Sequence, residues 1–543
     1  MRKTSKLLAL LLACVLVMSL LASCAGDGST NTNTDTNTNT TTDANTGDDV
    51  GSDDTTGSEN NTNSSGFDAD RPLKLVAMQD SGTLSPLGVT GGFIQVLNCF
   101  YEPLFDTKAD GSRIWILGTG LERISDIQYT LTIREGVTFS NGNPLTAEDV
   151  MYTMELCRDN PQFSLNVKVV DFEKTKVTGD YTIDLWYTEY NAAQEPGLTQ
   201  LLIMDKESYD EVSMTRTPIG TGPYVVTDYV VNSHLNVTAR DDYWGESAKI
   251  KNIEFKVINE DAQIINALET GDVDMASAIP IKDAAYVESL GYEVRVANSN
   301  YTYVAMYSML PGNPLESKEA RWAVSLAIDR QAIADILLQG LSTVTNYPAS
   351  QHQTDYEDRF ANMHETYSDA YNIERAKELA DQSGLTGKTI RIITNGSSAF
   401  NTIAEIIQAD LLNIDVNAEI VSYDQATYFG TMMDATNFEI AIFNPATPTM
   451  LACDVVAMYL TFISLGWTGP ERDLYGELSM GALAIYDDAA RGDKLYEVLQ
   501  MFTDYTPWYA LCEVVGARGI APYLTGVEFM IAGNIYYHTI EYR

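Results

Sequence analysis

The chain has 543 residues, of which 75 are acidic and 34 basic, so its formal net charge is −41. Because phosphate backbones and anionic membranes both attract basic surfaces, this charge argues against nucleic-acid binding and against electrostatic docking on a membrane. With only six cysteines and four histidines, the composition also argues against a disulfide scaffold and a multi-metal protein. The length predicts about three domains.

The first 23 residues are typical of a secretion signal. Basic residues precede an apolar run over residues 7–21, which is too short for a comfortable membrane span. The run ends in LASC at residues 21–24, which resembles the bacterial lipobox, where the cysteine is lipidated and the chain is cut before it. We therefore expect lipidation of Cys24. An ordinary signal peptide with an unrelated cysteine is the alternative.

Residues 24–70 are predicted to be the lipidated cysteine followed by a disordered tether. After Cys24 they consist almost entirely of Thr, Asn, Asp, Ser and Gly, with ten acids and no base. Such a composition buries too little apolar surface to offset the entropy of ordering. A flexible chain of this length reaches roughly 35–40 Å. No later apolar run is long enough to span a membrane, so we expect a globular body held near a membrane from outside.

The body begins with a predicted strand at residues 74–78. Residues 129–133 alternate apolar and polar side chains and predict a second strand. Thr146 is a candidate helix cap, because the acids that follow it favour the positive end of a helix. An apolar stripe then continues to Cys157.

Further elements alternate along the chain in the same way. Their spacing predicts a strand at 253–257 and helices capped by Asp261, Ser317 and Asn372, of which the first is stopped by Gly271 and the last by Gly384. This mixture of strands and helices favours a large α/β body with more than one lobe.

The cysteines of the body show no metal-binding spacing. We interpret them as small buried apolar residues, with one disulfide among them as the alternative. They are Cys99, Cys157, Cys453 and Cys512.

Catalytic and phosphate-binding motifs fail when they are tested residue by residue. His364-Glu365 lacks the second histidine of a zinc protease motif, and Gly387-Lys388-Thr389 lacks the first glycine of a phosphate loop. Arg491-Gly492-Asp493 is interpreted as a surface turn beside a helix. Since no nucleophile with a base and no metal cluster emerges, we expect neither an enzyme nor a cofactor or metal.

Four groups of motifs, in order along the body, resemble the extracellular solute-binding proteins of family five, the peptide and nickel binders of ABC importers. The motifs are YTLTIREGVTFSNGNPLTAEDVMYTM at 129–154; PIGTGPYVV at 218–226 with DDYWGE at 241–246 and INALETGDVDMA at 265–276; EARWAVSLAIDRQAIADILLQG at 319–340; and NIERAKELADQSGL at 372–385. We interpret these motifs as structural. Gly220, Gly222 and Pro223 would set a rigid bend, and Trp244 would pack under its loop.

The resemblance implies an α/β, two-lobed, periplasmic-binding-protein-like (type II) flytrap with an inserted third subdomain. The implied boundaries are 71–105, 191–296 and 504–543 for lobe I, 106–190 for the inserted subdomain and 297–503 for lobe II. Two crossover segments, near Val296–Asn300 and Thr503–Trp508, would form the hinge. Ligand would sit in the cleft, and closure of the lobes would bury it.

The resemblance also implies ligand-binding residues on both lobes. Those expected are Thr83, Leu84, Ser85, Asn98, Tyr101 and Glu102 on lobe I, and Tyr303, Tyr307, Phe443, Asn444 and Trp467 on lobe II. Asn444 stands about where the family has an aspartate that pairs with a peptide's amino group. An amide cannot supply that charge-assisted bond. Asp454, further along, is a candidate replacement.

A peptide or peptide-like solute is the first choice of ligand, and an oligosaccharide or another small organic solute is the alternative. Nickel is disfavoured because the four histidines are scattered. The implied partners are ABC permease subunits with cytoplasmic ATPases. We expect a monomer, lipid-anchored on the outer face of the bacterial cytoplasmic membrane. An extracytoplasmic enzyme and a surface adhesin are more distant alternatives.

Overall fold

The computed structural model describes the chain from Arg71 onward, with short gaps. The described residues are 71–89, 91–108, 111–160, 163–346, 349–362, 371–445, 449, 451–462, 465–531 and 533–543. The expected signal peptide, the lipidation site Cys24 and the tether lie outside the described residues. Nowhere in the described ranges does a helix combine the length and apolar character needed to cross a membrane.

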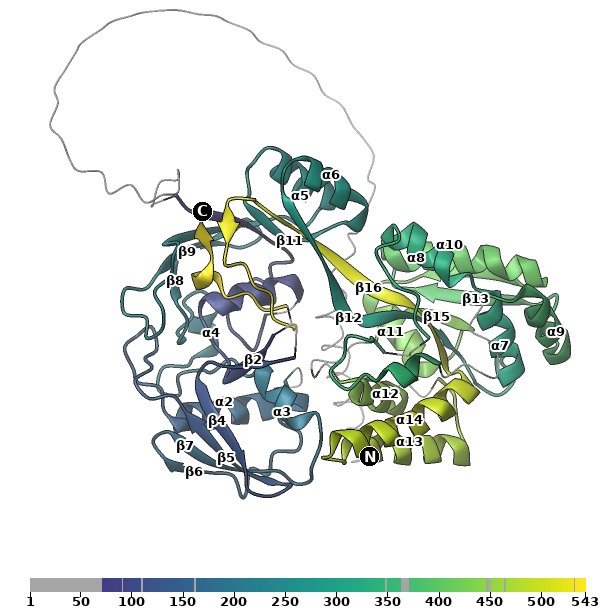
Figure 1. The fold of residues 1–543 in the computed structure, drawn as a ribbon, viewed down its shortest axis with the longest axis horizontal. Helices are drawn as coiled ribbons and strands as arrows, with labels where there is room; N and C mark the ends of the chain where they lie inside the picture. Colours follow the sequence, from purple (N-terminus) through teal and green to yellow (C-terminus); the bar gives the residue numbers. More distant parts are fainter. Residues whose placement is uncertain are drawn as a thin grey trace, which may run out of the picture.

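The body has two lobes that share one ten-stranded sheet (Figure 1). The strand order is β14-β13-β15-β12-β16-β11-β1-β10-β9-β8. These strands are β1 (Leu73–Ala77), β8 (Tyr224–Val230), β9 (His234–Ala239), β10 (Asn252–Val257), β11 (Met275–Ile279), β12 (Glu293–Tyr307), β13 (Thr389–Thr394), β14 (Asn417–Ser422), β15 (Ile440–Phe443) and β16 (Trp508–Ile520). The strands predicted at 74–78 and 253–257 are confirmed as β1 and β10.

The long strands β12 and β16 connect the lobes (Figure 1). They pair antiparallel along most of their length, with a register shift between Asn298 and Thr302. Asn298 lies opposite Val515, so the place where β16 passes from lobe II to lobe I is near residue 515. The second crossover was expected at Thr503–Trp508. The structure differs because β16 first pairs with β12 inside lobe II before it crosses.

A separate four-stranded sheet with helix α2 (Ala147–Asp159) lies beside lobe I. Its order is β4-β5-β7-β6, from β4 (Gly118–Arg123), β5 (Gln128–Ile133), β6 (Lys176–Gly179) and β7 (Thr182–Trp186). The strand predicted at 129–133 is confirmed as β5, whose alternate side chains are buried. The predicted start of α2 is also confirmed, because Thr146 and Asp149 form a capping box there.

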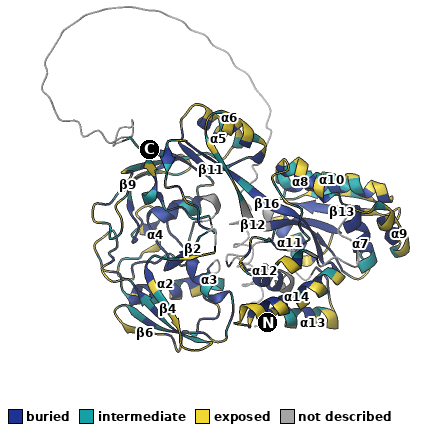
Figure 2. Cartoon of the chain, in the orientation of Figure 1, coloured by how far each residue is buried: buried dark blue, intermediate teal, exposed yellow. Residues whose placement is uncertain are grey.

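Helices surround the sheet of lobe II, and many of them show one buried and one exposed face (Figure 2). They are α7 (Lys318–Ala327), α8 (Arg330–Leu338), α9 (Ile373–Ser383), α10 (Ser398–Leu411), α11 (Gln425–Asp434), α12 (Ala452–Phe462), α13 (Pro470–Leu483) and α14 (Asp488–Tyr505). The predicted caps Ser317 and Asn372 are confirmed, since each side chain accepts a bond from the first helical turn.

Short elements complete lobe I and the loops. They are β2 (Phe105–Thr107), β3 (Arg113–Trp115), α3 (Gln194–Gly197), α4 (Glu211–Met214), α5 (Asp261–Glu269), α6 (Ala284–Ser289), β17 (Leu524–Thr525), β18 (Glu541–Tyr542) and the 3₁₀ segments Gly91–Cys99, Ser164–Val167, Leu198–Gln200, Ile281–Asp283, Asp358–Asn362, Leu412–Ile414 and Tyr537–Thr539. The predicted cap Asp261 is wrong by one residue. Glu260 occupies the cap position, and Asp261 begins the helix.

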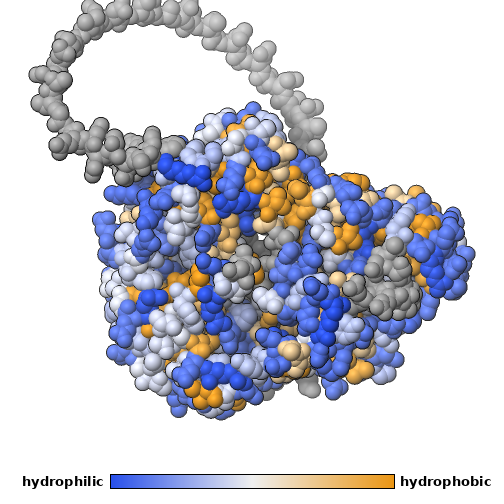
Figure 3. All heavy atoms as spheres, in the orientation of Figure 1, coloured by the Kyte–Doolittle hydropathy of each residue, from blue (hydrophilic) through white to orange (hydrophobic). Residues whose placement is uncertain are grey.

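Buried apolar side chains pack into three clusters. One joins α5 and α6 to lobe II, one lies in lobe I, and one covers residues 104–203 around the four-stranded sheet. The precise lobe boundaries stay predictions. The four body cysteines are buried and free, so the interpretation as small apolar residues is confirmed for this structure. The surface in Figure 3 is largely hydrophilic, in keeping with the high negative charge, and apolar side chains gather beside the crossing strands.

The bend at Gly220 and Gly222 exists because two backbone segments touch there. A Cβ on Gly220 would lie 2.1 Å from the carbonyl oxygen of Phe100, and one on Gly222 would lie 2.6 Å from that of Cys99. Neither backbone can give way easily, so only glycine fits. Nearby, the Trp244 indole N–H donates to the Thr221 carbonyl, as expected for a side chain packed under its loop.

Candidate functional site

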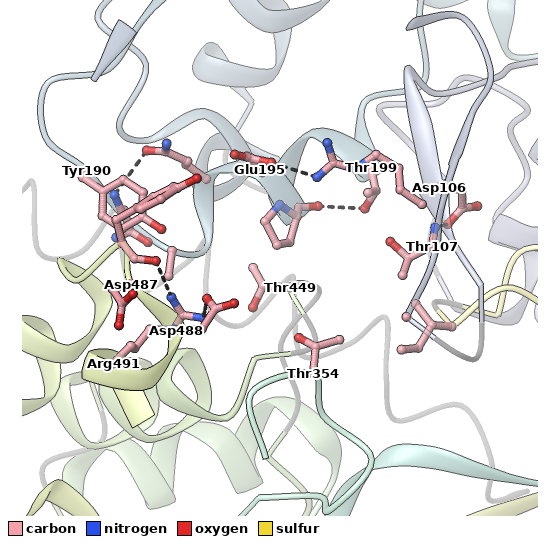
Figure 4. A pocket seen from close by; sticks show the side chains of 18 of the residues that line it. Asp106, Thr107, Tyr190, Glu195, Thr199, Thr354, Thr449, Asp487, Asp488 and Arg491 are labelled. Atoms are coloured by element: carbon pink, nitrogen blue, oxygen red, sulfur yellow. Dashed lines mark hydrogen bonds and ion pairs between the residues drawn. The ribbon is translucent and has the colours of Figure 1, made fainter. Parts of the chain in front are cut away.

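A cleft of about 870 Å³ lies between the lobes (Figure 4). One wall comes from β2, β3 and the segment around α3, and the other from lobe II. The lining residues share no single chemistry. They are Asp106, Thr107, Gly111, Arg113, Trp115, Tyr190, Asn191, Ala192, Gln194, Glu195, Pro196, Thr199, Thr354, Thr449, Tyr486, Asp487, Asp488, Ala489, Arg491 and Ile531.

The lobe I wall holds a fixed ion pair. The Arg113 guanidinium lies 2.8 Å from the Glu195 carboxylate and stacks over the Phe105 ring, 4.2 Å from its centroid. β3 positions Arg113 and α3 positions Glu195, so two separate elements build the pair. Stacking and pairing together hold the side chain flat against the wall.

Asp106 lies at the edge of the same wall and is almost fully buried. Its carboxylate accepts hydrogen bonds from the Asn534 amide at 2.9 Å and the Tyr536 hydroxyl at 2.8 Å. Burial raises the pKa of Asp106, and these bonds act in the opposite direction. Its donors tie the β2 end of the cleft to the C-terminal segment.

The lobe II wall is built around the start of α14. Arg491 lies 2.6 Å from the Asp488 carboxylate and donates to the carbonyl of Ile485 at 3.2 Å. Asp487 caps the helix by accepting from the Ala490 N–H at 2.8 Å. Arg491 was expected in a surface turn, but it lies inside the first helical turn and is 8% exposed.

Hydroxyl groups from two loops complete this wall. Thr449 and Thr354 both face the cleft in Figure 4. The Thr449 hydroxyl donates to Asp454 at 2.7 Å, and Asp454 is buried. Asp454, the candidate replacement for the missing aspartate, therefore lies directly behind a residue of the cleft.

The cleft offers groups that can bind a polar ligand. Both of its arginines are engaged by carboxylates, Arg113 by Glu195 and Arg491 by Asp488, and its other polar groups are the carboxylates of Asp106 and Asp487, hydroxyls and amides. Among the described residues no group of His, Cys, Asp and Glu could hold a metal ion. Aromatic rings, hydroxyls and amides, with four carboxylates against two arginines, suit a polar organic ligand that is neutral or positively charged.

The eleven ligand-binding residues expected from sequence lie outside this lining. On lobe I, Leu84 and Ser85 are fully buried, and Thr83 stabilises their turn by accepting from the Ser85 N–H. Tyr101 is buried in the lobe I core. Asn98 lines a separate cavity of about 30 Å³.

Glu102 is a buried carboxyl in the same region. It accepts from the Tyr243 hydroxyl at 2.6 Å and the Trp244 indole at 3.1 Å. Burial raises the pKa of Glu102 to about 7, although these hydrogen bonds lower it. Glu102 thus anchors the DYWGE motif to the loop before β2.

On lobe II, the expected residues pack mainly among themselves and their neighbours. Tyr303, Tyr307 and Phe443 belong to the buried core, and Trp467 stacks on Tyr505 with centroids 5.0 Å apart. Asn444 is half-buried at the end of β15. Whether any of the eleven touches ligand stays a prediction.

Sequence reasoning missed the residues that line the cleft. They come from places with little local pattern, such as the RIW stretch at 113–115 and the turn at 484–487. The sequence feature that could have pointed to them is an aromatic residue beside a charged one in a turn, as in EYNA at 189–192.

Comparison with known proteins identifies the fold and the family. Residues 123–461 match the profile of the bacterial extracellular solute-binding proteins, family 5 Middle. The nickel-binding periplasmic protein of Escherichia coli (strain K12) is 25% identical over 381 residues, covering 65% of this chain and 71% of that protein. A putative ABC transporter peptide-binding protein of Brucella ovis is 24% identical over 369 residues, covering 64% of this chain and 67% of that protein.

Among solved structures, a putative peptide binding protein, AppA from Clostridium difficile, has a TM-score of 0.78 at 16% identity, covering 87% of this chain and 100% of that one. The expected two-lobed α/β fold is confirmed by this likeness. The relatives are solute-binding proteins and not enzymes, which confirms the expected absence of enzymatic activity. Since the profile spans more than half of the sequence, this chain belongs to the bacterial extracellular solute-binding proteins of family 5.

Proposed function

We propose that this protein captures a peptide or a peptide-like solute in the cleft between its lobes and delivers it to the permease of an ABC importer. The observation that carries the proposal is the cleft itself, about 870 Å³ in volume and lined from both lobes. A ligand that touches both walls favours the closed arrangement, which gives the permease one shape to recognise.

The lining favours a peptide among the possible solutes. Peptides present alternating amide donors and acceptors, which hydroxyl groups of the lining, such as those of Thr354 and Thr449, can meet. Trp115 offers a ring for an apolar side chain. An oligosaccharide would also use rings and hydroxyls and is the second candidate. The similarity to a nickel-binding relative keeps a chelated metal as a third.

A thermal-shift experiment separates these candidates. The purified body, residues 71–543, is heated with a pool of tri- to hexapeptides, with malto-oligosaccharides, or with nickel chloride in the presence of L-histidine. A ligand at about 100 times its Kd stabilises the folded form by about 2.7 kcal/mol and raises the Tm. We expect a shift with peptides. A shift with sugars or nickel and none with peptides would contradict the proposal.

A cleft variant shows where the ligand binds. Thr354 is exposed and lines the cleft, so Thr354→Trp should fill it without disturbing the core. We expect it to abolish the peptide shift. Thr217→Trp, at an exposed position outside the cleft, is the matched control and should keep the shift.

The proposal includes a lipid anchor at Cys24 on the outer face of the cytoplasmic membrane, with residues 24–70 as the tether. The LASC sequence at 21–24 and the polar composition after it support this. The body then acts as a monomer, without nucleic acid, beside the permease and its ATPases. In cell fractionation, the full-length Cys24→Ala variant should no longer be found in the membrane fraction. An unchanged membrane fraction would contradict the anchor.

A further inference from the structure

The charges that line the cleft do not balance. Its carboxylates come from both lobes and outnumber its guanidinium groups; they are those of Asp106, Glu195, Asp487 and Asp488. Each arginine of the lining is already paired, Arg113 with Glu195 at 2.8 Å and Arg491 with Asp488 at 2.6 Å. The charge that remains is therefore negative, with one carboxylate on each wall.

Asp106 carries the remaining charge of the lobe I wall. It is 1% exposed, and its partners all donate to it: the Thr107 N–H at 2.7 Å, the Asn534 amide at 2.9 Å and the Tyr536 hydroxyl at 2.8 Å. Three donors favour the ionised form of a carboxyl group. Because all three are neutral, they stabilise the charge without cancelling it. A charge held in such a wall, where water is scarce, acts strongly on the neighbouring cavity.

Asp487 carries the remaining charge of the lobe II wall. It is exposed, and its carboxylate accepts from the Ala490 N–H at 2.8 Å at the start of α14. Capping needs only a polar oxygen, so the charge itself is not required by the helix. Figure 4 places Asp487 and Asp106 on opposite sides of the cleft. Every lysine and arginine from residue 71 onward is among the described residues, and none forms an ion pair with either carboxylate.

The aromatic rings of the cleft favour ligands of the same charge. The Arg113 guanidinium lies 5.3 Å from the centroid of the Trp115 ring, and that of Arg123 lies 3.6 Å from the centroid of the Tyr486 ring. Tyr190 meets Tyr486 edge to face, with centroids 5.5 Å apart, and all three rings line the cleft. The face of an aromatic ring is negative and attracts cations. The guanidinium groups of the chain itself therefore show that these rings suit positively charged groups.

We propose that the cleft selects a positively charged solute, a peptide that carries lysine or arginine, and that Asp106 and Asp487 set this preference from the two walls. The inference rests on the proposed function and names the class of peptide. The positive groups of such a peptide balance one carboxylate on each lobe, so that closure buries paired charges instead of isolated ones. An anionic solute brings like charges together and is rejected.

Calorimetric titration of matched peptides into the full chain, purified in a neutral detergent, tests this preference. The probes are a pentapeptide with two lysines, the same peptide with both lysines acetylated, and the same peptide with glutamates in their place. The lysine peptide should bind at least about tenfold more tightly than its acetylated twin, and the glutamate peptide should bind most weakly. The difference between the twins should shrink as the salt concentration rises, because salt screens the attraction.

Amide variants show which carboxylates set the preference. Asp106→Asn and Asp487→Asn each remove a charge with little change of shape, and each should reduce the preference for the lysine peptide about threefold or more. Asp241→Asn changes an exposed acid outside the cleft lining in the same way and should keep the full preference. Because Asp487 is exposed and asparagine also caps helices, Asp487→Asn tests the inference even if Asp106→Asn fails to fold.

A pair of sugars separates the charge of the solute from its chemical class. An oligomer of glucosamine is positively charged, and its N-acetylated twin is neutral. If the charged sugar bound more tightly than its twin and no peptide bound, the charge preference would stand and the peptide proposal would fail. Equal Kd values for the lysine peptide and its acetylated twin, or a preference unchanged in both Asp106→Asn and Asp487→Asn, would overturn the inference and leave peptide capture untouched.

Discussion

The two connections between the lobes differ greatly in construction. β12 and β16 pair from Glu293 opposite Ile520 to Met306 opposite Trp508, and both run into buried core. Among the described residues, the connection at the other end of the cleft is made by one backbone hydrogen bond, by the buried Ala193 and by ring contacts around the half-exposed Tyr486. The difference teaches where motion is possible. Because the tyrosine end is held by fewer interactions than the strand pair, we expect the lobes to separate there first.

The largest expected effect comes from damage to the strand connection. Trp508 begins β16, is 1% exposed and packs against Phe502 at 4.9 Å between ring centroids. Trp508→Ala should lower the free energy of unfolding by about 3–5 kcal/mol because it leaves a cavity in the core. Urea unfolding measures this loss, and Trp508→Phe should lower the free energy of unfolding clearly less than Trp508→Ala. A loss below about 1 kcal/mol would mean that the strand connection is not the rigid one.

The next effect concerns a buried carboxyl within that connection. Glu513, on β16 opposite Thr302, accepts from the Gln351 N–H at 2.8 Å. Burial raises the pKa of Glu513 to about 7, from an ordinary value near 4.5. The folded state therefore holds a proton that the unfolded state has released. The contribution of Glu513 to the free energy of unfolding is therefore fully present below about pH 4.5, and it is lost as the pH rises through about 7.

Glu513→Gln should reduce this pH dependence. At pH 8 the free energy of unfolding should be about 2–3 kcal/mol higher for the variant than for the wild type, because the variant avoids a buried charge. At pH 4 the two proteins should be nearly equal. Glu102→Gln is a useful comparison, because Glu102 has a similarly raised pKa but lies in lobe I, away from the strand pair. Urea unfolding at both pH values checks this, and equal pH profiles for wild type and Glu513→Gln would refute it.

The smallest effect is expected beside the contact around Tyr486. Asp487→Ala removes the cap of α14 and should cost about 1 kcal/mol, while Asp487→Asn should cost less. Thermal unfolding measures this cost. Full retention of stability in Asp487→Ala would show that the turn is held by Arg491 alone.

Features set by nearby residues could be predicted from the sequence. The capping box of Thr146 with Asp149, and the caps at Ser317 and Asn372, depend on three or four consecutive residues and were found correctly. The two-lobed fold followed from motifs whose glycines serve close backbone contacts, such as Gly220 against Phe100.

The cleft lining could not be predicted because tertiary packing assembles it. Arg113, Tyr190 and Arg491 are far apart in the chain, and none belongs to a recognisable motif. Arg491 was read as part of a surface turn because helix α14 begins without a strong apolar pattern. The crossing point on β16 was misplaced for a similar reason, since only strand pairing reveals where the chain leaves lobe II.

Solute capture between the lobes is tested most directly by calorimetric titration of the best peptide from the thermal screen into wild type and Thr354→Trp. The account predicts at least about tenfold weaker binding for Thr354→Trp, equivalent to about 1.4 kcal/mol, and unchanged binding for Thr217→Trp. Equal Kd values for wild type and Thr354→Trp would place the ligand elsewhere and contradict the account.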